Sequence, residues 1–148
     1  SDGHPIQVLI PDPLSREIIE RYSTDEPANF ELGLDGLAGR VRDWNALAKR
    51  HTSLKVRIYH RYPVANVTIL DDRVYVAPVL FKRRAKDNLT AIFRRPSKGA
   101  AAYEDHFDKV FAQGAAEITQ EYLGLLTKSF PQTTVTTHQS ERIQPASI

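Results

Sequence analysis

The chain has 148 residues, 41% hydrophobic and 26% charged, a composition typical of one globular domain rather than a disordered segment. Its formal net charge of +2 is too small by itself to indicate a nucleic acid or membrane partner. The absence of cysteine excludes disulfides, thiolate metal sites and a cysteine nucleophile, and it fits a cytoplasmic location. The sequence contains neither a signal peptide nor the roughly 20-residue apolar run that spans a bilayer. Because methionine is also absent, we expect a fragment of a longer protein.

The first third of the chain predicts one strand and two helices. The apolar run 6–10 predicts a buried strand that ends at a turn. In that turn Asp12 is placed to cap a short helix beginning at Pro13. A longer helix, ending near residues 51–53, is predicted by apolar residues that recur every three or four positions: Leu34, Leu37, Val41, Trp44 and Ala48.

The middle and end of the chain predict strands and then a helix. Alternating or apolar runs favour strands at 54–59, 64–70, 74–81 and 90–94. A long helix is expected from residue 100, with Gly114 able to split it in two. Its predicted buried stripe is Tyr103, Phe107, Val110, Phe111, Ile118, Tyr122 and Leu125.

This order of elements predicts the α/β (α+β) class, a mixed β-sheet flanked by helices. We expect one domain over residues 1–130. Residues 131–148 are polar and rich in threonine, which predicts a C-terminal tail with a short strand at 133–137. No internal repeat is present.

The region from Leu54 to Val76 resembles the phospholipase D motif, in which a strand leads into His-x-Lys, four apolar residues and Asp. Asp71 stands at the motif Asp, whereas Val64 and Asn66 stand at the motif His and Lys. Over residues 6–115 the chain is also similar to the non-catalytic phospholipase D-like domains at the C-terminus of some bacterial helix-turn-helix regulators. The segments that carry this wider resemblance are 7–13, 56–59, 69–76 and 103–111.

The resemblance implies half of a phospholipase D-like fold that lacks that family's chemistry. Valine can neither attack phosphorus nor carry a proton, and asparagine has no charge to stabilise an oxyanion. His60 lies four residues before Val64, with no lysine two residues after it, so a shifted frame does not restore the motif. We therefore predict no catalytic residue and no cofactor. The resemblance also implies a homodimer that brings two Asp71 hairpins together, and DNA binding through a domain outside this sequence.

Candidate binding residues fall in two regions. The trio His60, Arg61 and Tyr62 leaves a strand end, where α/β folds commonly bind ligands and where such side chains can stack on a base or hold a phosphate. Their alternative role is an exposed strand end in which Tyr62 covers the core. Asn66 joins the candidates because of its motif position. Asp71 does so for the same reason, although it equally suits a plain turn.

The second region is the segment 82–98, where seven Lys and Arg residues stand against one acid. It is predicted either to bind phosphate groups or to be a solvated loop. The candidates in it are Arg83, Arg84, Arg94, Arg95 and Lys98. No metal site is predicted, because His106 and the acids near it do not share the spacing of helical ligands. Asp105 and Lys109 instead predict an ion pair on the helix surface.

Three functions remain open from the sequence. The first is a non-catalytic, ligand-sensing or dimerisation module of a bacterial regulatory protein, binding a phosphorylated small molecule or a nucleotide. The second is a phosphodiesterase, either nuclease or phospholipase, with a relocated site at His60 and His106. The third is direct binding of nucleic acid or an anionic membrane through the segment 82–98.

Overall fold

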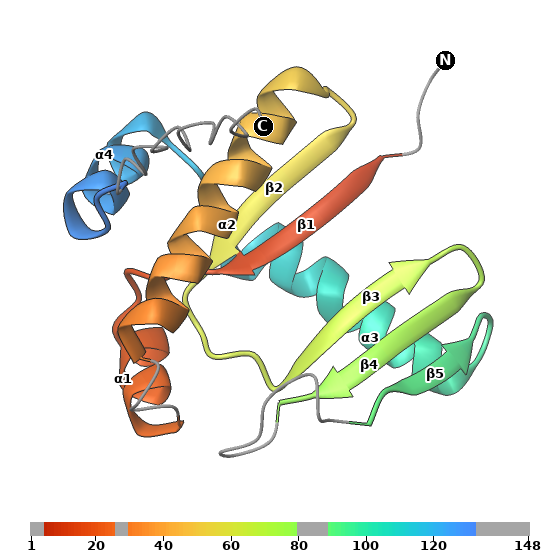
Figure 1. Ribbon diagram of the computed structural model, residues 1–148. Helices are drawn as coiled ribbons and strands as arrows, with labels where there is room; N and C mark the ends of the chain where they lie inside the picture. The colour runs from red at the N-terminus through yellow and green to blue at the C-terminus, as the bar shows by residue number, and fades with distance from the viewer. Residues whose placement is uncertain (1–4, 26–29, 80–88, 133–148) are drawn as a thin grey trace, which may run out of the picture.

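The computed structural model describes residues 5–25, 30–79 and 89–132. These residues form four α-helices and two three-stranded β-sheets (Figure 1). The predicted α+β class is therefore confirmed. The strands are divided between two small sheets, however, where one mixed sheet was expected. None of the described helices is both long enough and apolar enough to cross a membrane.

The first sheet is built around a parallel strand pair. Strand β1 (Ile6–Pro11) pairs in parallel with β2 (Leu54–Tyr59), and β2 pairs antiparallel with the short β6 (Ala115–Glu117). The crossover from β1 to β2 contains α1 (Arg16–Asp25) and α2 (Phe30–Arg50). In Figure 1, α2 runs across one face of β1 and β2. This arrangement places the carboxyl ends of β1 and β2 side by side.

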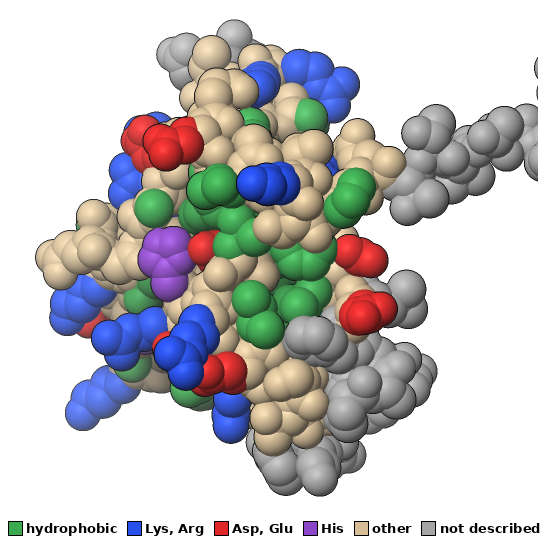
Figure 2. Space-filling model, turned by 90° about the vertical axis from the view of Figure 1, so that its left-hand side faces the viewer, with side chains coloured by type: hydrophobic (Ala, Val, Ile, Leu, Met, Phe, Trp, Pro, Cys, Tyr) green, Lys and Arg blue, Asp and Glu red, His purple; other side chains and the backbone are tan. Residues whose placement is uncertain are grey.

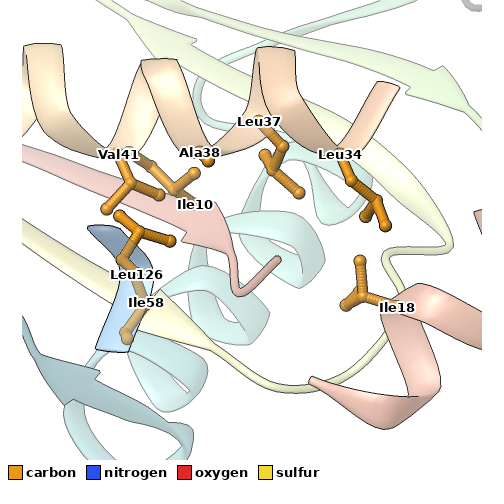
Figure 3. Close-up of a cluster of buried hydrophobic side chains, with 8 residues drawn as sticks. All are labelled: Ile10, Ile18, Leu34, Leu37, Ala38, Val41, Ile58 and Leu126. Carbon is orange, nitrogen blue, oxygen red and sulfur yellow. The ribbon is translucent and has the colours of Figure 1, made fainter. Parts of the chain in front are cut away.

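The main hydrophobic core lies between α2 and the first sheet. The predicted stripe of α2 is buried at Leu34, Leu37 and Val41, and Trp44 packs half-buried against the same cluster. Each fully buried aliphatic side chain of this kind contributes about 1.5–3 kcal/mol. Figure 3 shows the buried residues converging from α1, α2, β1, β2 and α4: Ile10, Ile18, Leu34, Leu37, Ala38, Val41, Ile58 and Leu126.

The second sheet is antiparallel and has its own small core. Its strands are β3 (Ala65–Leu70), β4 (Arg73–Pro78) and β5 (Ala91–Arg94), in that order. Helix α3 (Lys98–Lys109) packs on one face over Val74 and Val76. Gly99 lies so close to the ring of Phe93 that a Cβ there would overlap it. The predicted strand at 74–81 corresponds to β4, which ends at Pro78, and residues 80 and 81 lie outside the described part of the chain.

The C-terminal helix prediction is partly wrong. After α3 the chain makes a π-helical turn (Val110–Gly114), forms β6 and begins α4 (Gln120–Ser129). The interruption comes at Gly114, as predicted, but the strand that follows was not foreseen. Because α4 is a separate helix with its own direction, Leu126 is its buried residue and Leu125 is 53% exposed. The predicted strand at 133–137 lies outside the described residues.

Candidate functional site

A buried carboxylate lies where the two parallel strands end. Asp12 directly follows β1 and is 4% exposed, the only polar side chain among the described residues that is buried. Its Oδ2 lies 2.9 Å from Nδ1 of His60, the residue that follows β2. Its Oδ1 accepts hydrogen bonds from the hydroxyl of Tyr122 at 2.6 Å and from the backbone N–H of Leu14 at 2.9 Å. We call Asp12, His60 and Tyr122 the Asp12 cluster.

The Asp12 cluster satisfies a group that would otherwise be costly to bury. An ionised carboxylate in a protein interior is tolerated only when its oxygens are hydrogen-bonded or paired with charge. Burial raises the pKa of Tyr122 far above its usual range, and its hydrogen bond to the Asp12 carboxylate acts in the same direction. Tyr122 therefore remains a neutral hydrogen-bond donor throughout the physiological range.

His60 is the exposed member of the Asp12 cluster, with 57% of its side chain accessible. Since Nδ1 faces Asp12, Nε2 is the ring nitrogen free to meet a ligand. Ser15 Oγ donates to the backbone carbonyl of His60 at 2.5 Å, not to the imidazole ring. The arrangement is therefore not a Ser-His-Asp triad, in which serine bonds the ring directly.

The residues after His60 are held in place by α1. Glu17 Oε1 accepts a hydrogen bond from the backbone N–H of Tyr62 at 2.9 Å. The guanidinium of Arg21 lies 5.1 Å from the centre of the Tyr62 ring, within the range of a cation–π contact. Tyr62 also packs against the main core. Its covering role, one of the two predicted alternatives, is thereby confirmed, while Arg61 beside it is exposed.

A groove of about 1540 Å³ opens beside the Asp12 cluster, between the first and second sheets. Its walls include β1, β3 and α3, and His60 lies along it. Five of the ten predicted binding residues line this single groove: His60, Arg61, Tyr62, Asn66 and Arg95. Residues 35 positions apart in sequence are thus brought to one site.

The other predicted binding residues have different surroundings. Asp71 adopts a positive φ of 50° in the turn between β3 and β4, a conformation that Asp and Asn tolerate better than most residues. Arg94 and Lys98 are exposed outside the groove. Arg83 and Arg84 lie outside the described residues. Of the described Lys and Arg residues in the segment 82–98, Arg95 alone therefore lines the groove together with His60 and Arg61.

Arg95 lines the groove but is already bound within the protein. Its guanidinium pairs with the carboxylate of Glu104 and donates to the backbone carbonyl of Asp71 at 2.7 Å. These contacts join α3 to the β3–β4 turn, so the role that the structure gives Arg95 is a structural one. On the face shown in Figure 2, Lys and Arg side chains are interspersed with hydrophobic and acidic ones.

The predicted surface ion pair on α3 is confirmed, with Lys109 Nζ lying 2.7 Å from Asp105 Oδ2. His106 is exposed and lines the groove from α3. Within residues 5–25, 30–79 and 89–132, no three His, Asp or Glu side chains gather as metal ligands would. Hydrogen-bonding, charged and apolar side chains together line the groove.

Sequence reasoning identified His60 but missed its partners. Asp12 was predicted to cap a helix that begins at Pro13, whereas α1 begins at Arg16. The Asp12 carboxylate accepts from the N–H of Leu14 in the turn before α1 and also joins two strand ends and α4. Its position directly after a buried strand was the available signal, because polar residues there commonly form sites in parallel sheets. Tyr122 gave no such signal, since an aromatic residue on a helical stripe predicts only core packing.

Comparison of the chain with protein-family models, curated proteins and solved structures finds no match. The resemblance to phospholipase D-like domains therefore stays a prediction that rests on the motif positions given above. Two of those positions are exposed: Val64, which directly precedes β3, is 78% exposed, and Asn66 lies on the side of β3 away from its core.

Proposed function

We propose that this domain is a non-catalytic ligand-binding module of a larger regulatory protein. Its ligand would be a phosphorylated small molecule or a nucleotide, held where the groove meets the Asp12 cluster. The observation that carries the proposal is the Asp12–His60 pair, in which a buried acid fixes an exposed imidazole beside a groove. In its protonated form the ring donates from both nitrogens. His60 then bonds Asp12 and a phosphate oxygen at the same time.

Arg61 supplies the second anion-binding group in this proposal. It is exposed, lines the same groove and directly follows His60. Guanidinium groups bind phosphate oxygens through two parallel hydrogen bonds. Together His60 and Arg61 suit a terminal phosphate, while the groove beyond them has room for the rest of the ligand.

Thermal denaturation against a panel of nucleotides and sugar phosphates tests the proposal. A ligand at 100 times its Kd adds about 2.7 kcal/mol of stability. His60→Ala and Arg61→Ala should each abolish the shift. His51→Ala is a matched control, because His51 is exposed at the end of α2 and does not line the groove. A shift retained in His60→Ala, or no shift with any ligand of the panel, would contradict the proposal.

A second candidate function is phosphodiester hydrolysis. It is favoured by the Asp12–His60 contact, since an acid that orients a histidine is a common feature of nucleophilic and acid–base catalysis. His106 lines the same groove from α3 and would be the general acid. Hydrolysis of bis(p-nitrophenyl) phosphate, lost in both His60→Ala and His106→Ala, would support this function. Activity that survives both changes would exclude these roles.

Three further proposals follow from the sequence alone. We propose a cytoplasmic homodimer, which sedimentation equilibrium would detect. From the resemblance to bacterial helix-turn-helix regulators, we also propose that this domain is attached to a DNA-binding domain. Direct binding of nucleic acid or anionic lipid through the segment 82–98 is the remaining alternative, and its signature is an affinity that falls steeply with salt.

A further inference from the structure

The groove has walls made of strand edges that no other described strand covers. β1 is an outer strand of the first sheet and pairs only with β2, whereas β3 is an outer strand of the second and pairs only with β4. Both strands line the groove. Figure 1 shows them as the facing edges of the two sheets, with α3 running behind the second sheet.

The hydrogen bonds of β1 identify which of its backbone groups face the groove. Ile6 and Asp12 each donate their N–H toward the β2 side of the sheet, at 2.9 Å. Because the N–H and C=O of one residue point to the same side and alternate along a strand, even-numbered residues of β1 face β2. Gln7 and Leu9 therefore present both of their backbone groups to the groove.

Strand β3 likewise directs alternate backbone groups away from its partner strand. The N–H of Val79 donates to the carbonyl of Val64 at 2.9 Å, so this pair is a hydrogen-bonded pair of the antiparallel ladder. Such pairs recur at every second residue, which leaves Ala65, Val67 and Ile69 with backbone groups directed away from β4. Each wall of the groove thus presents donors and acceptors at the spacing of a β-strand.

The side chains of the groove carry balanced charge. Three acidic residues and three Lys or Arg residues line it: Glu17, Glu104, Asp108, Arg61, Arg95 and Lys109. α3 adds the apolar side chains of Phe107 and Val110. The volume of about 1540 Å³ exceeds the roughly 300–1,000 Å³ typical of small-molecule pockets. Along β1 and α3, away from the phosphate-binding end at His60 and Arg61, the occupant that matches these features is long, uncharged and able to hydrogen-bond through its backbone.

We propose that the groove binds an extended, uncharged segment of a partner polypeptide, which adds a strand to the edge of β1. Backbone hydrogen bonds to Gln7 and Leu9 supply affinity, and alternate apolar side chains of the segment rest against α3. Pro5 and Pro11, which lack an N–H, bracket these two residues. The prolines limit pairing to a short segment and protect the edge from open-ended self-association.

The test uses a display library of random linear octapeptides selected on the purified domain. Enriched sequences should alternate apolar with small polar residues and carry few charges. Gln7→Pro should weaken a selected synthetic peptide about tenfold or more, because loss of one backbone bond and the ring's bulk together reach about 1.4 kcal/mol. Gln7→Ala is the matched control and should change Kd less than about twofold, since the Gln7 side chain is exposed.

Gln7→Pro should still fold, because the N–H that it removes makes no bond to β2. Amide hydrogen exchange provides a second readout that needs no variant, as the amides of Gln7 and Leu9 should gain protection when the peptide binds. Three results would overturn the proposal: no enriched peptide, equal binding to Gln7→Pro, or a homodimer that Gln7→Pro abolishes, which would make a second copy the occupant. Phosphate-ligand binding measured in Gln7→Pro keeps this test separate from the His60 proposal.

Discussion

Removing the hydroxyl of Tyr122 tests the energetic importance of the Asp12 cluster. In Tyr122→Phe the 2.6 Å hydrogen bond to Asp12 is lost while the ring remains. Hydrogen bonds to a charged group contribute about 1.5–3 kcal/mol, and the buried carboxylate loses one of its three partners. We expect the free energy of unfolding to fall by about 2 kcal/mol. With a urea m-value near 2 kcal/mol per M, the denaturation midpoint would move by about 1 M.

A matched variant makes this measurement specific. Tyr75 is half-buried on β4, and its hydroxyl makes no hydrogen bond within the described residues. Tyr75→Phe should therefore change stability by less than about 0.5 kcal/mol. A double-mutant cycle of Tyr122→Phe with Asp12→Ala should give a coupling energy of about 1 kcal/mol or more. Equal losses in both tyrosine variants, or additive effects in the cycle, would refute the reasoning.

Three further predictions concern stability. Gly99→Ala should lower the free energy of unfolding by about 1–3 kcal/mol, because the added methyl group would overlap the ring of Phe93. Gly36→Ala is the control: it has open space around it and should be neutral or stabilising. Arg57→Ala should cost about 1–3 kcal/mol through loss of its 2.6 Å bond to a backbone carbonyl of the π-helical turn, and urea denaturation measures all three variants. Burial raises the pKa of both Tyr59 and Tyr122. The stabilisation from these two neutral tyrosines should therefore be complete below the unfolded tyrosine pKa of about 10 and should decline as pH rises above it. The decline should be smaller in Tyr122→Phe. A decline of equal size in that variant would show that Tyr122 does not contribute to it.

Local pattern predicted most of the elements but not how they assemble. The periodicity of α2 identified its buried face, because one apolar stripe on a helix leaves little choice of orientation. The order of strands contained no comparable constraint, so the division into two sheets could not be foreseen. The strand β6 has only three residues and follows Gly114 inside an otherwise helical pattern, which makes its signal too short to detect.

The sequence could predict only the part of the candidate site that follows directly from a residue's place at a strand end. His60 directly follows a strand, and strand ends are expected binding positions. Its partners come from 48 and 62 residues away in sequence, and a helical stripe does not specify which aromatic residue reaches a carboxylate. The strongest signal in the sequence, the basic segment 82–98, led elsewhere: Arg95 turned out to bind Glu104. Clustered charge in sequence does not reveal which charges are neutralised in space.

The Asp12 cluster also offers a physical route for the relay that a sensing module requires. Asp12 contacts the exposed His60 with one oxygen and Tyr122 of α4 with the other. Because the two contacts share a single carboxylate, we expect that the proposed phosphate ligand, by moving the imidazole, alters the hydrogen bond to Tyr122. α4 also contributes Leu126 to the main core. The position of α4 therefore depends on the hydrogen bond of Tyr122 to Asp12 and on the burial of Leu126.

We therefore expect ligand binding at His60 to change the hydrogen exchange of α4 amides, with Tyr122→Phe binding the same ligand but showing a smaller change. A ligand at His60 can change the behaviour of α4 only if it interacts differently with two states of the domain. The smaller change in the variant would identify the Asp12 cluster as the connection. Exchange in α4 that does not respond to the ligand, or that responds equally in Tyr122→Phe, would show that any signal leaves the domain by another path.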